Sequence, residues 1–93
     1  MFQVLSWNIR QGGGSRLGKI ISKIESIRPQ VLALNEFRNN ASGIQLRNQL
    51  LKIGYRFQVV SHAPKDANSV LLASSYPCQS SFFRDVIQNM III

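Results

Sequence analysis

Two side chains that can offer oxygen ligands follow apolar segments of this 93-residue sequence. Asn8 lies near the end of the apolar segment 2–9, and Glu36 follows the apolar segment 31–34. If both segments are neighbouring strands, their carboxyl ends converge at the edge of the sheet where α/β proteins gather ligands. Carboxylate and amide oxygens are ligands that Mg²⁺ takes. The spacing predicts a partial magnesium site. The alternative is that Asn8 turns the chain and Glu36 is a solvated loop acid.

Basic side chains stand close to both of these residues. Arg10 and Arg38 each lie two positions beyond a proposed site residue, and we expect them to contact phosphate, although loop arginines in solvent are the alternative. The net charge of +7 comes from eleven Lys and Arg against four Asp and Glu, which favours an anionic partner such as nucleic acid or another phosphate ester. A helical stripe of Arg16, Lys19 and Lys23 is either the solvated face of a helix or a contact for a phosphate backbone.

The first half of the chain reads as strand, glycine loop and helix. Segment 2–9 is rich in β-forming residues, and the glycines at 12–14 predict a permissive loop. Ser15 is a plausible N-cap, and Pro29 ends the helix. The apolar residues of this helix recur every three or four positions: Leu17, Ile20, Ile21, Ile24 and Ile27.

The second half adds a strand, a helix and two strands. Segment 31–34 predicts a buried strand, Ser42 caps the next helix, and Gly54 stands at its C-terminal end. Strands at 55–60 and 69–74 follow, joined by a turn. The order predicts the α/β class, with one mixed sheet and two helices on one face.

Segment 13–19 spells a rival motif, G-x-x-x-x-G-K, which is typical of a phosphate-binding loop. Ile20 stands where that loop needs Ser or Thr for magnesium. Gly18 also falls inside the helical pattern, so we expect a helix there instead.

Three segments in order resemble the endonuclease/exonuclease/phosphatase family. They are LSWNI at 5–9, PQVLALNE at 29–36 and NSVLLASSYP at 68–77. The resemblance implies that residues 1–78 form the N-terminal half of a four-layer α/β/β/α sandwich, with 79–93 a divergent tail. It also implies magnesium-dependent hydrolysis of phosphodiester bonds, with Glu36 as the direct Mg²⁺ ligand. Asn8 would be the amide of the metal site that faces the phosphate.

The sequence departs from the family in its later motifs. The family's Ser-Asp-His and Gly-Asp-x-Asn motifs are missing from their expected places, and Ser75 replaces a common basic residue. We assign Asp66, Ala67 and Asn68 to a turn, and His62 to a loop. Without a general base, we expect a truncated phosphoesterase or nuclease that is weak or inactive alone, so enzyme status stays open. The alternative is a non-catalytic basic fragment that binds nucleic acid.

Two expectations concern the whole molecule. The inner sheet face would lack a partner sheet and drive self-association through these residues: Val4, Trp7, Leu32, Leu34, Phe57, Val59, Val70 and Leu72. The single cysteine, Cys78, cannot form an internal disulfide, which favours a cytoplasmic location. No apolar run reaches the roughly 18–20 residues that a membrane span needs.

Overall fold

The computed structural model describes residues 3–10, 12–64 and 66–77. The predicted tail at 79–93 and Cys78 lie outside these residues. Along the chain the elements are β1 (Val4–Asn8), the short 3-10 helix η1 (Gly14–Arg16), α1 (Leu17–Ile27), β2 (Val31–Arg38), α2 (Ala41–Lys52), β3 (Phe57–Val60) and β4 (Asn68–Ser74).

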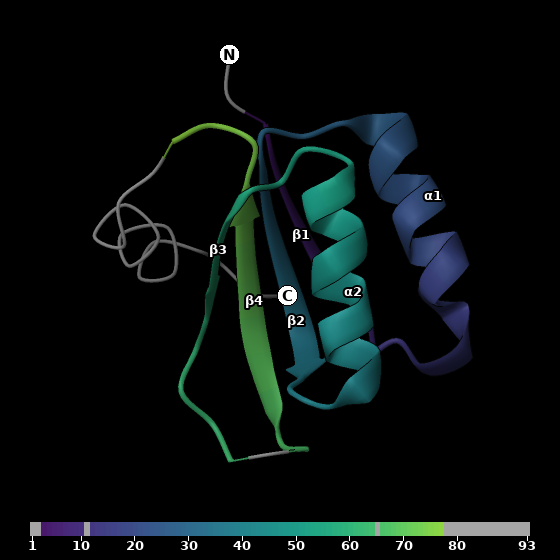
Figure 1. Cartoon of the computed structure of the whole chain (residues 1–93), viewed down its shortest axis with the longest axis vertical. Helices are drawn as coiled ribbons and strands as arrows, with labels where there is room; N and C mark the ends of the chain where they lie inside the picture. The colour runs from purple at the N-terminus through teal and green to yellow at the C-terminus, as the bar shows by residue number, and fades with distance from the viewer. Residues whose placement is uncertain (1–2, 11, 65, 78–93) are drawn as a thin grey trace.

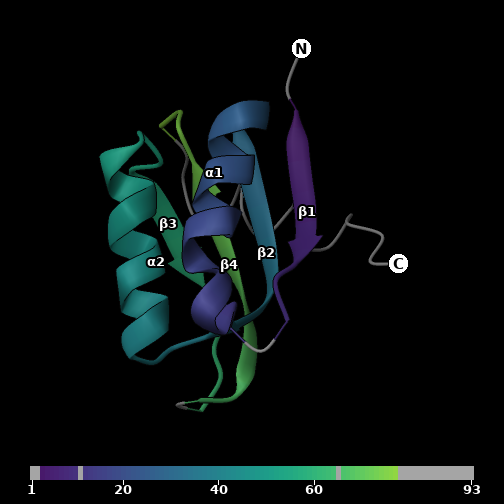
Figure 2. The same ribbon diagram turned by 90° about the vertical axis from the view of Figure 1, so that its right-hand side faces the viewer.

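The four strands form one mixed sheet in the order β1-β2-β4-β3. β1 runs parallel to β2, and β4 is antiparallel to both β2 and β3. Both helices lie side by side over one face of this sheet (Figures 1 and 2). The predicted α/β class, with one mixed sheet and two helices on one face, is therefore confirmed.

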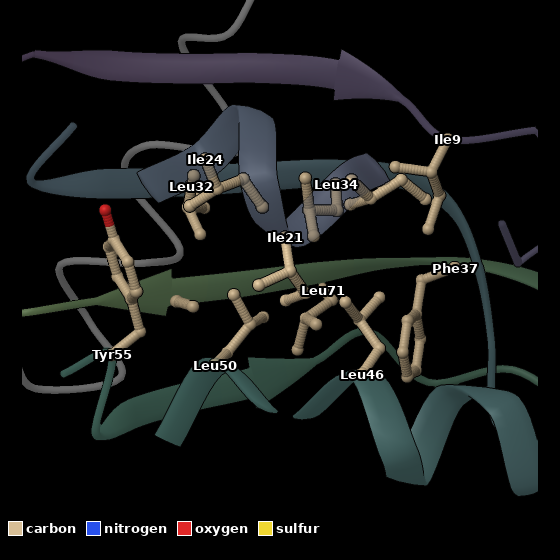
Figure 3. Close-up of a cluster of buried hydrophobic side chains, with 12 residues drawn as sticks. Ile9, Ile21, Ile24, Leu32, Leu34, Phe37, Leu46, Leu50, Tyr55 and Leu71 are labelled. Carbon is tan, nitrogen blue, oxygen red and sulfur yellow. The ribbon is translucent and has the colours of Figure 1, made fainter. Parts of the chain in front are cut away.

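The main core lies between the helices and the sheet (Figure 3). Of the apolar residues that the helical spacing predicted for α1, Ile20, Ile21 and Ile24 are buried here, whereas Ile27 is 40% exposed. Residues of α2, β2 and β4 complete this core: Leu32, Leu34, Phe37, Leu46, Leu50, Leu71 and Ala73. Tyr55 closes one end of this core, where its hydroxyl donates a hydrogen bond of 2.6 Å to the carbonyl of Pro29. Burial raises the pKa of Tyr55, against the opposing charge of Arg28.

The other face of the sheet carries a second, smaller apolar cluster, and the predicted membership of this face was partly wrong. Trp7, Leu32 and Leu34 belong to the helix side. The second cluster contains Val31, Ala33, Leu72, Phe57, Val59 and Val70. Val31, Ala33 and Leu72 are buried, whereas Val4 is 48% exposed. The continuous apolar run of β2 hides which alternate residues face the helices. Self-association through this face stays a prediction.

Two predicted helix caps were wrong. Ser15 lies inside η1, and its side chain makes no cap to α1. The N-cap of α2 is Asn40, whose side chain accepts a hydrogen bond of 3.0 Å from the amide of Gly43, whereas Ser42 lies within the helix. Gly54 does follow the end of α2, with a φ of 110°.

Two further differences concern the strand and loop boundaries. β2 continues through Glu36 to Arg38, although these residues were expected beyond its end. Gly18 and Lys19 lie in the first turn of α1, which agrees with the helix expected there. None of the described helices has the length and apolar character needed to cross a bilayer.

Candidate metal and phosphate site

The loop after β1 is fastened to the end of β2. Asn8 pairs with Asn35 in the parallel ladder, and the Ile9 amide donates a hydrogen bond of 3.0 Å to the Asn35 carbonyl. The Gly12 amide then donates a hydrogen bond of 2.7 Å to the Glu36 carbonyl. The structure therefore brings the backbones at Asn8 and Glu36 to one edge of the sheet.

Gly12 also lets Arg38 approach this loop. A Cβ atom at Gly12 would lie 3.2 Å from the Cβ of Arg38, and the φ of Gly12 is 76°. Both the close approach and the left-handed backbone favour glycine at this position. The side chain of Arg38 consequently runs along the loop that follows β1 instead of extending away from it.

Glu36 occupies an irregularity of β2. The register with β4 shifts between Asn35 and Phe37, and Glu36 has a φ of 60°. A left-handed conformation costs a residue with a side chain about 1–2 kcal/mol. Phe37 points into the core and is fully buried, while Glu36 is half-buried. Such bulges redirect side chains next to active sites, and strained residues cluster at functional sites.

Asn68 joins the two β2 residues of this site. Its amide nitrogen donates a long hydrogen bond of 3.4 Å to Oε1 of Glu36. Its amide oxygen accepts a hydrogen bond of 3.1 Å from Nε of Arg38. Asn68 is the first residue of β4, so its assignment to a turn was wrong. No local pattern in the sequence indicates this role, because the pairing of β4 with β2 depends on long-range register.

The turn itself ends one residue earlier. The Ala67 amide donates a hydrogen bond of 3.1 Å to the Pro64 carbonyl, and Asp66 has a φ of 63°. His62 is exposed in the connection between β3 and β4. Because β3 and β2 both run antiparallel to β4, this connection lies at the same edge of the sheet as Glu36.

Asn8 and Arg10 interact locally. Oδ1 of Asn8 accepts a hydrogen bond of 2.8 Å from the Arg10 amide, which supports the turn that was the alternative interpretation of Asn8. Within the described part of the chain, the side-chain nitrogen Nδ2 of Asn8 has no hydrogen-bond partner. It is therefore free to donate to a phosphate oxygen.

A groove of about 560 Å³ opens beside Asn8 at the start of α1. Its lining combines three basic residues with an aromatic side chain: Trp7, Asn8, Ile9, Arg10, Arg16, Lys19 and Ile20. The three basic residues predicted to share one helical stripe do not share one groove. Arg16 and Lys19 line this groove, whereas Lys23 lines a separate depression. We call this the basic groove.

Arg16 builds the loop wall of the basic groove. Its Nη2 donates hydrogen bonds of 3.0 Å to the Ile9 carbonyl and 2.8 Å to the Arg10 carbonyl. Its Nε donates a third, of 3.2 Å, to the Gly13 carbonyl. These contacts hold a positive charge over the loop, so the groove attracts anions.

The donor set for a cation is partial. Among residues 3–10, 12–64 and 66–77, no three or more His, Cys, Asp or Glu side chains are grouped to hold a metal ion. Glu36 contributes one carboxylate, and Asn8 and Asn68 are nearby in the fold. Mg²⁺ commonly keeps several waters and binds through one or two carboxylates plus substrate phosphates. The residues present fit that mode in part.

The mixed sheet with two helices on one face is similar to part of a larger solved structure. The chain is similar to an AP endonuclease from Archaeoglobus fulgidus, with a TM-score of 0.62 and 24% sequence identity. The match covers 81% of this chain and 28% of that protein's chain. No family model and no curated protein matches the sequence.

Proposed function

We propose that this chain is the N-terminal part of a magnesium-dependent phosphoesterase that acts on nucleic acid. The observation that carries the proposal is the bulge at Glu36, where a carboxylate sits in a strained conformation beside the β1 loop, Arg38 and Asn68. The fold likeness to an AP endonuclease and the net charge of +7 both favour a nucleic-acid substrate.

Each residue of the site has a distinct role in this proposal. Glu36 binds Mg²⁺, and Asn8 donates its amide N–H to a phosphate oxygen. Arg10 and Arg38 neutralise phosphate charge, with Arg38 aimed by Asn68. When bound, Mg²⁺ supplies Lewis-acid stabilisation of charge on the phosphate. Glu36 is the one carboxylate that we assign to the site, and the described residues hold no group of three or more His, Cys, Asp or Glu side chains, so we expect weak or absent turnover from this chain alone.

Metal binding in the presence of substrate tests the role of Glu36. Mn²⁺ is a suitable probe, because it takes the same oxygen ligands as Mg²⁺ and is seen by electron paramagnetic resonance. With a short abasic DNA duplex present, we expect Glu36→Gln to weaken Mn²⁺ binding about tenfold or more, since it removes the carboxylate ligand of the proposed site.

The matched control is Glu25→Gln. Glu25 is an exposed acid on α1, away from the site, and this variant changes the net charge by the same amount. Equal losses of Mn²⁺ affinity in both variants would contradict the proposed site. Hydrolysis of the abasic duplex that survives repurification and vanishes in Glu36→Ala would instead overturn the expected lack of activity.

The basic groove favours a second candidate, a non-catalytic nucleic-acid-binding fragment. Arg10, Lys19 and Trp7 combine positive charge with an aromatic ring, a pairing that is typical of such surfaces. This candidate predicts that Glu36→Gln binds the duplex as well as the unaltered chain does, with or without divalent metal.

A further inference from the structure

A second groove lies at the other end of the sheet, between α2 and the β3 strand. It has a volume of about 280 Å³ and shares no lining residue with the basic groove. Its walls are Ile44, Arg47, Asn48, Leu51, Arg56 and Gln58. Because β3 and β1 are at opposite ends of the strand order, this groove is separate from the candidate site. We call it the α2–β3 groove.

The helical wall of the α2–β3 groove exposes apolar surface. Ile44 is 56% exposed and Leu51 is 45% exposed. They lie seven residues apart on α2, hence on one face and two turns apart. The opposite face of α2 buries Leu46 and Leu50 in the core. Large exposed aliphatic side chains grouped on one face are typical of surfaces that contact a partner.

The same groove holds two guanidinium groups. Nε of Arg47 donates a hydrogen bond of 3.0 Å to Oε1 of Gln58. The amide nitrogen of Gln58 donates in turn to the carbonyls of Arg47 at 3.0 Å and Tyr55 at 2.9 Å. These three hydrogen bonds of the Gln58 side chain hold Arg47 against β3. Arg56 is exposed nearby and completes the positive rim.

No acidic side chain of the described residues faces this rim. The acids described are Glu25 on α1, Glu36 in β2 and Asp66 in the β3–β4 connection, and none lines the α2–β3 groove. Within the described residues, the groove therefore presents two cations with no acidic side chain to balance them. Its charge is complementary to carboxylates, which arginine binds in a planar, bidentate geometry.

We propose that the α2–β3 groove binds an acidic peptide segment of another protein. An apolar side chain of the peptide lies between Ile44 and Leu51, and flanking carboxylates pair with Arg47 and Arg56. A nucleic acid fits less well, because the lining includes no aromatic ring on which a base could stack and its apolar walls are aliphatic. The proposal is independent of the phosphoesterase proposal.

The test uses the full chain and a short fluorescein-labelled peptide of alternating glutamate and leucine, with binding followed by fluorescence anisotropy. Two comparison peptides replace either the leucines by serine or the glutamates by glutamine. We expect the parent peptide to bind, and each comparison peptide to bind about tenfold more weakly, because each removes one of the two contact types.

Variants of the chain then locate the binding. Arg56→Glu and Leu51→Ser should each weaken the parent peptide about tenfold. Lys23→Glu, an equal charge reversal at an exposed residue of α1, should leave affinity unchanged. Circular dichroism verifies that each variant is folded, and Ile44→Ala replaces Leu51→Ser if that variant is not.

Three outcomes would overturn the proposal. Equal weakening by Lys23→Glu would show a non-specific charge effect. Equal binding of the serine-containing peptide would show that the apolar walls are not used. Displacement of the peptide by a single-stranded DNA oligonucleotide, together with loss of that DNA's binding in Arg56→Glu, would assign the groove to nucleic acid.

Discussion

At Asn68, one carboxamide group contacts two side chains of β2. Its nitrogen donates to Glu36 and its oxygen accepts from Arg38, so a single rotation of the amide would break both contacts. The arrangement suits a residue that positions others, because neither contact requires Asn68 to touch a metal or a phosphate. Supporting residues of this kind orient the ligands that do.

The variant Asn68→Ala tests whether Asn68 positions Glu36 and Arg38 or only stabilises the fold. The hydrogen bonds it removes are exposed, so we expect the free energy of unfolding to fall by only about 0.5–1 kcal/mol. Mn²⁺ affinity in the presence of abasic duplex should fall about tenfold, as for other supporting partners of metal ligands. Asn48→Ala, which changes an exposed residue of α2, is the control: it should leave Mn²⁺ affinity unchanged and should not lower stability, because alanine has a higher helix propensity than asparagine. A loss of stability without loss of Mn²⁺ affinity would remove Asn68 from the site.

At the scale of elements, the sequence predicted both helices but not the residues that cap their N-termini. Apolar spacing placed α1 and α2, and the rule for sheet edges brought the ends of β1 and β2 together. Ser42 and Asn40 are equally suitable caps in sequence. Asn40 is the N-cap because its side chain accepts a hydrogen bond from the Gly43 amide, and Gly43 lies close to the ring of Phe37 and the carbonyl of Arg38. That approach depends on the packed sheet, which local sequence does not report.

The same limit applies to the candidate site. The convergence of Asn8 and Glu36 at one sheet edge follows from strand order, which the sequence pattern reveals. The bulge that turns Glu36 cannot be predicted from the sequence pattern. It arises from pairing with β4, a strand more than thirty residues later in the sequence. Asn68 was missed for the same reason.

Two glycine substitutions test the close approach of α2 to β2. A Cβ at Gly43 would overlap the Arg38 carbonyl and lie 2.9 Å from Cζ of Phe37, so Gly43→Ala should destabilise the fold by about 1–3 kcal/mol. At Gly18 in α1 a Cβ meets nothing within 4 Å. Gly18→Ala should therefore stabilise the fold by about 0.5–1 kcal/mol.

Urea unfolding followed by circular dichroism measures both changes. The sign difference is the decisive result, because each substitution adds the same methyl group to a helix. If both alanines stabilise the protein, α2 does not approach β2 as closely as the structure has it.

At the scale of the whole molecule, two groups of basic side chains lie at opposite ends of one sheet. Arg10, Arg16 and Lys19 lie at the basic groove, and Arg47 and Arg56 lie at the α2–β3 groove. The surfaces that we propose for nucleic acid and for an acidic peptide are therefore separable by mutation. The net charge of +7 alone does not distinguish them.

Salt dependence of DNA binding makes this separation measurable. Each phosphate contact of duplex DNA contributes about −0.9 to the slope of log affinity against log salt concentration, so Arg10→Ala with Lys19→Ala should reduce the slope by about 2. Arg56→Ala should leave the slope unchanged. Arg16 is left intact because its hydrogen bonds hold the β1 loop. Equal changes in slope would show that DNA contacts the molecule without a preferred face.

The backbone at Glu36 also bears on how such a chain changes over evolutionary time. Glycine would adopt its left-handed conformation without steric cost, so retaining an acid there forgoes stability that a single substitution makes accessible. If Glu36 binds metal as we propose, homologous chains that have lost the metal have no functional reason to keep an acid in this conformation. Glycine or asparagine at this position would then mark homologues that kept the fold and lost the proposed chemistry.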